Sequence, residues 1–263
     1  MPHSIMKRVL GDCECWPHLN SVRIGYDGNS TTIATRPMII FSKIKKYIVM
    51  VIALSASLSI AEIELYTEFP SEIIPGERYV IYSHGLIVEG ENSRPEHPKF
   101  GTYEFVKIKE AIFYRGGFNL IAHHRPENTN IAEYVKKLES WVHRLVDSGV
   151  KPSKITLVGF SRGSHLTAFA SDKLSALGIN TALLASCMDG DIPTKPPLSL
   201  SGNLLSVYET SDVMGTCEKL ANQSTLKSFR EISISTGLTH GAFFLPLPEW
   251  IVPLKEWIHE TNR

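Results

Sequence analysis

The sequence predicts an α/β fold, with a mostly parallel central sheet flanked by helices. Short apolar runs alternate along the chain with amphipathic segments of helical period, a pattern typical of βαβ units. One β-branched run, over residues 154–160, leads directly into a glycine-rich turn and a helix-compatible segment over 164–174. The chain has 263 residues, of which 43% are hydrophobic and 21% are charged, which is enough for one sizeable core.

The first 61 residues are expected to lie outside this core. A lysine-rich segment over 43–46 precedes an apolar run over 47–60, which closes at Ser59-Ile60-Ala61. A basic segment, a short apolar segment and small residues at the cleavage point are typical of a secretory signal peptide. The run is shorter than the roughly 20 apolar residues that a membrane-spanning helix needs. A retained N-terminal anchor and a buried first helix are the weaker alternatives.

The position of this apolar run sets the expected domain boundaries. Signal peptides begin close to the initiator methionine, and Met38 is a more usual start than Met1. We therefore interpret residues 1–37 as an over-extended gene model or a disordered leader, and residues 38–61 as the signal peptide. Residues 62–263 are expected to form the folded domain, which would be mildly acidic and either periplasmic or secreted.

The elements of this domain follow in order from hydrophobic period and turn residues. Alternation over 63–68 predicts an edge strand, and a wholly apolar run over 79–83 predicts a buried one. Apolar residues at helical spacing over 103–114 and 131–146 predict two amphipathic helices, each of which ends at a glycine. Further strands are expected over 118–122, 154–160, 181–186, 203–209 and 229–236, and a further helix over 164–174.

The turn after the strand over 154–160 carries a chemical motif. It reads Gly159-Phe160-Ser161-Arg162-Gly163, which is Gly-x-Ser-x-Gly between a strand and a helix. Such a turn exposes the serine, and the two glycines remove side chains that would clash with neighbouring elements. The dipole and free N–H groups of the helix N-terminus favour developing negative charge there. We expect Ser161 to be a nucleophile, and an ordinary glycine-rich βα turn is the alternative.

Two later strand ends supply groups that would activate such a serine. Asp212 follows the strand over 203–209, and His240 follows the strand over 229–236. Catalytic groups of open parallel sheets collect beyond the carboxyl ends of the strands. The chain order of serine, acid and histidine is also the order that nucleophile elbows of this kind need.

From about residue 79 onwards, these motifs resemble the α/β-hydrolase superfamily, and particularly its small members without a cap domain, akin to dienelactone hydrolases and carboxylesterases. The resemblance implies an α/β-hydrolase fold, shortened at its N-terminal side because only one clear strand precedes residue 79. It also implies a catalytic triad of Ser161, Asp212 and His240.

The resemblance further implies an oxyanion hole. In the superfamily a His-Gly pair follows the strand before the first core helix, and His84-Gly85 matches this pair. The donors would be the backbone amides of Leu86 and Arg162. His84 is expected to hold the oxyanion loop, because a base at this position would break the order of the family.

Several carboxylates are candidates for the acid of the triad. Asp212 has the favoured position, three residues beyond its strand. Asp189 and Asp191 follow the strand after the elbow, where some relatives place the acid, and Glu209 lies at a strand end. Asp212 could also cap a helix beginning at Val213.

Cys187 and Cys217 are the cysteines of the expected exported domain. In the sheet of the family the strands that precede them are neighbours, and both loops face the same edge. An exported domain with an even pair of cysteines favours a disulfide between them. Two unpaired buried thiols are the alternative.

The resemblance implies a serine hydrolase, most readily a carboxylesterase that acts on small or medium acyl esters through an acyl-enzyme. A lipase, thioesterase or peptidase with the same triad is the alternative among enzymes, and a non-catalytic α/β-hydrolase-like binding protein is the alternative from another class. Residues 86–99 are expected to form the rim of the entrance, and the connection over 187–202 is too short for a lid.

No cofactor is expected. Adjacent histidines such as His123-His124 point to opposite faces of an extended chain, so they make a poor metal site. The 27 basic and 27 acidic residues balance, and such a balance does not favour nucleic acid as a partner. A small-molecule ester is the expected partner, with no stable membrane anchor once the signal peptide is cleaved.

Overall fold

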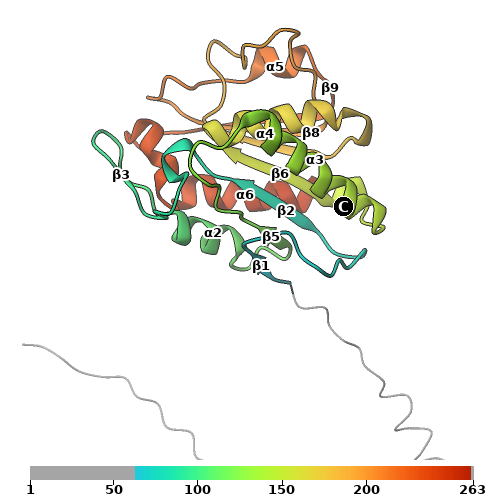
Figure 1. The fold of residues 1–263 in the computed structure, drawn as a ribbon. Helices are drawn as coiled ribbons and strands as arrows, with labels where there is room; N and C mark the ends of the chain where they lie inside the picture. The colour runs from blue at the N-terminus through green and yellow to red at the C-terminus, as the bar shows by residue number, and fades with distance from the viewer. Residues whose placement is uncertain (1–62, 262–263) are drawn as a thin grey trace, which may run out of the picture. The chain divides into compact units, whose positions relative to one another are not determined.

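The computed structural model describes residues 63–261, and a parallel sheet forms its centre (Figure 1). Within these residues the sheet has seven strands in the order β1-β5-β2-β6-β7-β8-β9, and every neighbouring pair is parallel. The predicted α/β class is therefore confirmed. The strands are β1 (Leu65–Tyr66), β2 (Tyr79–Ser83), β5 (Asn119–Ile121), β6 (Ile155–Phe160), β7 (Asn180–Leu184), β8 (Ser201–Glu209) and β9 (Thr225–Ile234).

Helices cover both faces of the sheet (Figure 1). On one face lie α2 (Phe105–Phe113) and α6 (Pro248–Thr261), and on the other lie α3 (Ile131–Asp147) and α4 (Arg162–Lys173).

Along β2 the side chains alternate between the apolar clusters on the two faces of the sheet. In β2, Val80 and Tyr82 pack with residues of α2 and α6, while Tyr79 and Ile81 pack with residues of α3 and α4. All four side chains are buried. Strands that are covered on both faces are apolar throughout, and for this reason the run over 79–83 is readable as a buried strand.

Some elements were not predicted from the sequence. Helix α6 contains Pro253, and a proline interrupts the pattern by which a helix is usually identified. Strands β3 (Glu96–His97) and β4 (Gly101–Thr102) form a separate antiparallel pair of two residues each, too short for a period to show. The short helix α5 (Glu218–Asn222) was also missed.

A disulfide joins Cys187, which follows β7, to Cys217, which precedes α5. Its two Cα atoms are 5.3 Å apart, and both side chains are buried. The bond expected from the sequence is therefore present. In the chain-entropy view, a bridge over 30 residues stabilises a domain by about 3 kcal/mol.

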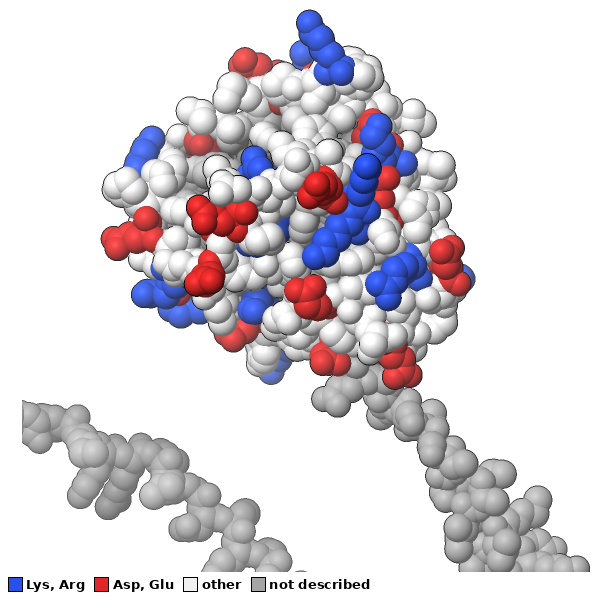
Figure 2. Space-filling view, in the orientation of Figure 1, with Lys and Arg blue, Asp and Glu red and all other residues white. Residues whose placement is uncertain are grey.

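The predicted leader over 1–37 and signal peptide over 38–61 lie outside the described residues. No helix within residues 63–261 is long and apolar enough to cross a membrane. Figure 2 shows basic and acidic side chains interspersed over the face in view, in keeping with the balanced composition.

Candidate active site

Ser161 lies at a strained turn between β6 and α4. Its φ and ψ angles are 53° and −120°, a combination that costs a non-glycine residue free energy and persists only where the surroundings enforce it. A Cβ at Gly159 would lie 2.5 Å from the Ser164 Cα, and a Cβ at Gly163 would lie 2.5 Å from the Ser83 carbonyl carbon. Only glycine fits at both positions, as the Gly-x-Ser-x-Gly motif requires.

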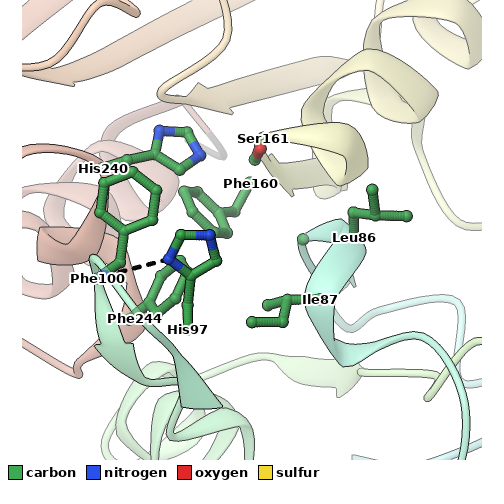
Figure 3. A pocket seen from close by; sticks show the side chains of 9 residues that line it. Leu86, Ile87, His97, Phe100, Phe160, Ser161, His240 and Phe244 are labelled. Carbon is green, nitrogen blue, oxygen red and sulfur yellow. Dashed lines mark hydrogen bonds between the residues drawn. The ribbon is translucent and has the colours of Figure 1, made fainter. Parts of the chain in front are cut away.

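A pocket of about 370 Å³ opens in front of Ser161 (Figure 3). Ser161 and His240 lie at the same end of it, and Figure 3 shows one nitrogen of the His240 ring directed towards Ser161. No hydrogen bond joins the two side chains in the described part of the chain. Catalytic hydrogen bonds are often long in ligand-free sites and tighten when substrate binds. The lining residues are Gly85, Leu86, Ile87, His97, Phe100, Phe160, Ser161, His240 and Phe244.

His240 is held by Asp212 and by two aromatic rings. It lies in a short 3₁₀ segment (Thr239–Phe244) after β9, and its Nδ1 is 2.7 Å from Asp212 Oδ2. With its proton on Nδ1 the ring donates to the carboxylate, and Nε2 is left free to accept a proton. The ring centroid lies 4.9 Å from that of Phe160 and 5.6 Å from that of Phe100.

Asp212 lies in the loop after β8, and its side chain is only 4% exposed. Its second oxygen, Oδ1, accepts a hydrogen bond from the Val213 amide at 2.7 Å. The alternative that Asp212 caps a helix beginning at Val213 is wrong, because the next helix in the described residues begins at Glu218.

The other candidate acids have different partners. Asp191 pairs with Lys219 at 3.6 Å and accepts a hydrogen bond from the Gln223 side chain at 3.1 Å. Asp189 is exposed. Of the four carboxylates considered from the sequence, the structure brings Asp212 against His240.

Glu209 is buried at the end of β8 and joins the two loops that carry Asp212 and His240. Its Oε2 accepts the Ser211 amide at 2.7 Å, and its Oε1 accepts the amides of Thr236 and Gly237 at 2.8 and 3.0 Å. Burial by itself raises the pKa of Glu209, but these hydrogen bonds outweigh it and lower the pKa to about 2. Glu209 therefore acts as a clamp behind the site, a role that the sequence did not reveal because Thr236 is 27 positions away.

We expect Glu209→Gln to lower the free energy of unfolding at pH 7 by about 2–3 kcal/mol, because an amide cannot satisfy the same N–H donors as a carboxylate. The folded-state pKa lies below the ordinary value of 4.5, so this stabilisation is complete above that value and is lost as the pH falls towards 2. Urea unfolding of both proteins at pH 7 and pH 3 measures the difference, which should be smaller at pH 3. The exposed Glu249→Gln serves as the control. An equal difference at both pH values would contradict the role given to Glu209.

The two expected oxyanion donors begin helical segments. Leu86 is the first residue of a 3₁₀ segment (Leu86–Val88), and Arg162 is the first residue of α4. Within the described residues neither backbone amide donates a hydrogen bond, as is usual for the first N–H groups of a helix. Leu86 lines the same pocket as Ser161, and Arg162 directly follows Ser161 in the chain.

The loop after β2 is held from behind by two buried side chains. His84 Nε2 accepts the Arg125 amide at 2.9 Å, and its Nδ1 donates to the Gly85 carbonyl at 2.8 Å. An Arg125 guanidinium N–H donates back to the His84 carbonyl at 2.6 Å. Burial lowers the pKa of His84 well below its ordinary value, and the Arg125 charge adds to this effect. His84 is therefore a neutral supporting residue, in the role expected for it.

Glu89 connects this loop to helix α4, which directly follows Ser161. Its Oε1 lies 3.2 Å from Arg125 Nε and 3.1 Å from Arg162 Nε, with the Glu89 side chain only 4% exposed. His124 Nε2 adds a contact of 2.6 Å to the Val88 carbonyl. His124 and Arg125 thus support this loop, whereas His123 lies against Glu68 and Lys137. The Glu89 network was not predicted, since its partners lie 36 and 73 positions away.

Among known proteins, the chain is similar to several solved structures. No protein-family model matches the chain, and no curated protein matches it. An esterase/lipase from an uncultured bacterium is 15% identical, with 71% of this chain and 78% of that chain covered at a TM-score of 0.49. A monoacylglycerol lipase from Paleococcus ferrophilus is 14% identical, with 70% and 94% covered at a TM-score of 0.49. A truncated carbohydrate esterase from gut microbiota is 14% identical, with 74% and 89% covered at a TM-score of 0.48.

The chain has the α/β-hydrolase fold. This assignment rests on the parallel sheet with helices on both faces, and on the strained serine turn between β6 and α4. In the described residues no cap domain is present, and the connection from β7 to β8 contains no helix.

Proposed function

We propose that this protein is a serine hydrolase that cleaves carboxylic esters with small or medium acyl groups. The observation that carries the proposal is the contact of 2.7 Å between Asp212 and His240, whose ring lines the same pocket as the strained Ser161. A buried carboxylate, an oriented imidazole and an exposed hydroxyl in the chain order of an α/β-hydrolase are the groups that acyl transfer requires.

In the proposed mechanism, His240 Nε2 removes the proton from Ser161 Oγ as this oxygen attacks the ester carbonyl. Asp212 holds the tautomer of His240 and stabilises the imidazolium that forms. The amides of Leu86 and Arg162 donate hydrogen bonds to the oxyanion, and His240 passes its proton to the leaving alcohol. A water molecule activated by His240 then releases the acyl group from Ser161.

The pocket supports the proposed size of the substrate. Its volume of about 370 Å³ lies near the lower end of ligand sites in proteins, and its wall is formed largely by the rings of Phe100, Phe160 and Phe244. A short or medium acyl chain fits such a space better than a long one. A lipase, thioesterase or peptidase would use the same triad, so substrate preference separates these activities.

A series of 4-nitrophenyl esters from acetate to dodecanoate tests the proposed substrate class. We expect kcat/KM to be highest for acyl chains of about two to six carbons and to fall for longer ones, because the pocket is small. A maximum at dodecanoate would indicate a lipase, and a preference for thioesters or peptides of equal acyl size would indicate the other two activities.

We also propose that the folded domain over 62–263 is exported to the periplasm or secreted after cleavage following Ala61. The Cys187–Cys217 disulfide supports this location, since such bonds persist in oxidising compartments. N-terminal sequencing of the protein from the extracytoplasmic fraction should read Glu62 first. Cytoplasmic protein that still begins at Met1 would contradict both the signal peptide and the leader over 1–37.

A further inference from the structure

One polar side chain in the wall of the pocket has no part in the proposed mechanism. Of the nine lining residues, Ser161 and His240 belong to the proposed triad, and His97 is the remaining one with a polar side chain. It lies on β3, opposite Gly101 of β4, within the rim over 86–99.

The His97 ring is fixed in place by its own hairpin. Its Nδ1 accepts the backbone amides of Lys99 at 3.1 Å and Phe100 at 3.2 Å. The ring stacks on that of Phe100, with centroids 4.5 Å apart and planes at 19°, and it meets the Phe244 ring edge-on at 6.3 Å. These contacts leave the ring little freedom to rotate, so the direction of its other nitrogen is set before substrate binds.

This arrangement places a hydrogen-bond donor in the pocket. Because Nδ1 accepts two amides, the proton of the neutral ring lies on Nε2. Figure 3 shows this second nitrogen on the side of Ser161, away from the backbone of the hairpin. Among residues 63–261 no group accepts a hydrogen bond from it. The two rings in contact with it, those of Phe100 and Phe244, offer no strong acceptor.

We propose that His97 is a substrate-recognition residue, whose Nε2–H donates to an oxygen atom that the ester carries in addition to its scissile group. The favoured substrates are compact esters whose chain is otherwise apolar and packs against the Phe rings of the pocket. This chain carries one further oxygen atom, which belongs to an ether, a carbonyl or a hydroxyl group. A site with a fixed donor favours a substrate that pairs with it over one that leaves it unpaired. This inference rests on the proposed esterase function and narrows its substrate class. This additional oxygen lies on either the acyl or the alcohol side of the ester. In both cases it would accept the same hydrogen bond from His97 Nε2–H.

Two isosteric pairs of esters test both sides. On the acyl side, 4-nitrophenyl 3-methoxypropanoate is compared with 4-nitrophenyl pentanoate. On the alcohol side, 2-methoxyethyl butanoate is compared with butyl butanoate. Each pair exchanges one methylene for an oxygen, and the ratio of kcat/KM within a pair is measured for each protein, so that intrinsic reactivity cancels between proteins.

The variants are His97→Asn and His97→Gln. The Asn Oδ1 can accept the amides of Lys99 and Phe100 in place of Nδ1, so this variant keeps the turn but loses the distal donor. The Gln amide supplies an N–H near the position of Nε2. In at least one pair, we expect His97→Asn to reduce the ratio of oxygen ester to hydrocarbon ester by about tenfold. His97→Gln should retain more of that ratio.

An unchanged ratio in both pairs, whether the rates are kept or fall equally for the two members of each pair, would overturn the role of His97 while leaving the esterase function in place. Absence of hydrolysis of all four esters by the unmodified protein would instead overturn the proposed function, and the recognition role with it.

Discussion

Replacing Ser161 by alanine is expected to reduce kcat for ester hydrolysis by about 10⁴- to 10⁶-fold, since the attacking oxygen is removed and only the oxyanion donors and the binding pocket remain. His240→Ala should have an effect of the same order, because an uncharged serine hydroxyl is a poor nucleophile without a base. The double variant should have a kcat little lower than that of either single variant, because the effects of substituting residues that act as a unit are not additive. Steady-state assays with an active short-chain ester measure all three.

The matched controls are Ser175→Ala and His143→Ala, which alter an exposed serine and an exposed histidine. Both should keep their activity to within about twofold. If Ser161→Ala retains most of its esterase activity while it unfolds at the same temperature as the unmodified protein, the nucleophile has been wrongly assigned.

Asp212→Asn is expected to reduce kcat by about 10⁴-fold, the size of effect that follows when the acid of such a triad becomes an amide. An amide N–H facing Nδ1 favours the wrong tautomer of His240, in which Nε2 carries the proton and cannot accept another. The corresponding changes at Asp189 and Asp191 should cost less than about threefold, because Asp189 is exposed and Asp191 has Lys219 and Gln223 as partners. A damaging Asp189→Asn beside a harmless Asp212→Asn would show that the acid lies after β7.

Much of the fold is predictable because its physical causes are local. Strands that are covered on both faces must be apolar along their whole length, so β2 and β6 are recognisable from single runs. The helix over 131–147 is recognisable from one apolar stripe. Prediction failed where local rules are broken, as at Pro253 in α6, or where an element is too short for its period to show, as in β3 and β4.

The candidate site could be predicted only in part. Order along the chain and position after strands indicated Ser161, Asp212 and His240, but the sequence could not exclude Asp189 or Asp191, since the choice depends on which loop reaches the histidine. Glu209 was considered as an acid and is instead a clamp for two loops. Contacts that span many positions, like this one, leave no periodic pattern in a sequence.

The hydrogen-bond donor at His97 could not be predicted from the sequence, for a different reason. The sequence indicated only a polar rim over 86–99, and a histidine there reads as one more polar residue. Its role depends on the turn of the hairpin, which supplies two amides to Nδ1 and so fixes both the tautomer and the direction of the ring. Local backbone geometry of this kind becomes visible only in three dimensions.

The measurement that most directly tests the central claim is the reaction of the native protein with a fluorophosphonate, followed by mass mapping of the adduct. An activated serine reacts with this probe, and a non-catalytic binding protein does not. We predict one adduct, located on Ser161, which is absent in Ser161→Ala and forms much more slowly in His240→Ala and Asp212→Asn. An unlabelled protein, an adduct on another residue, or labelling at an undiminished rate in His240→Ala would contradict the assignment of Ser161, Asp212 and His240 as a catalytic triad.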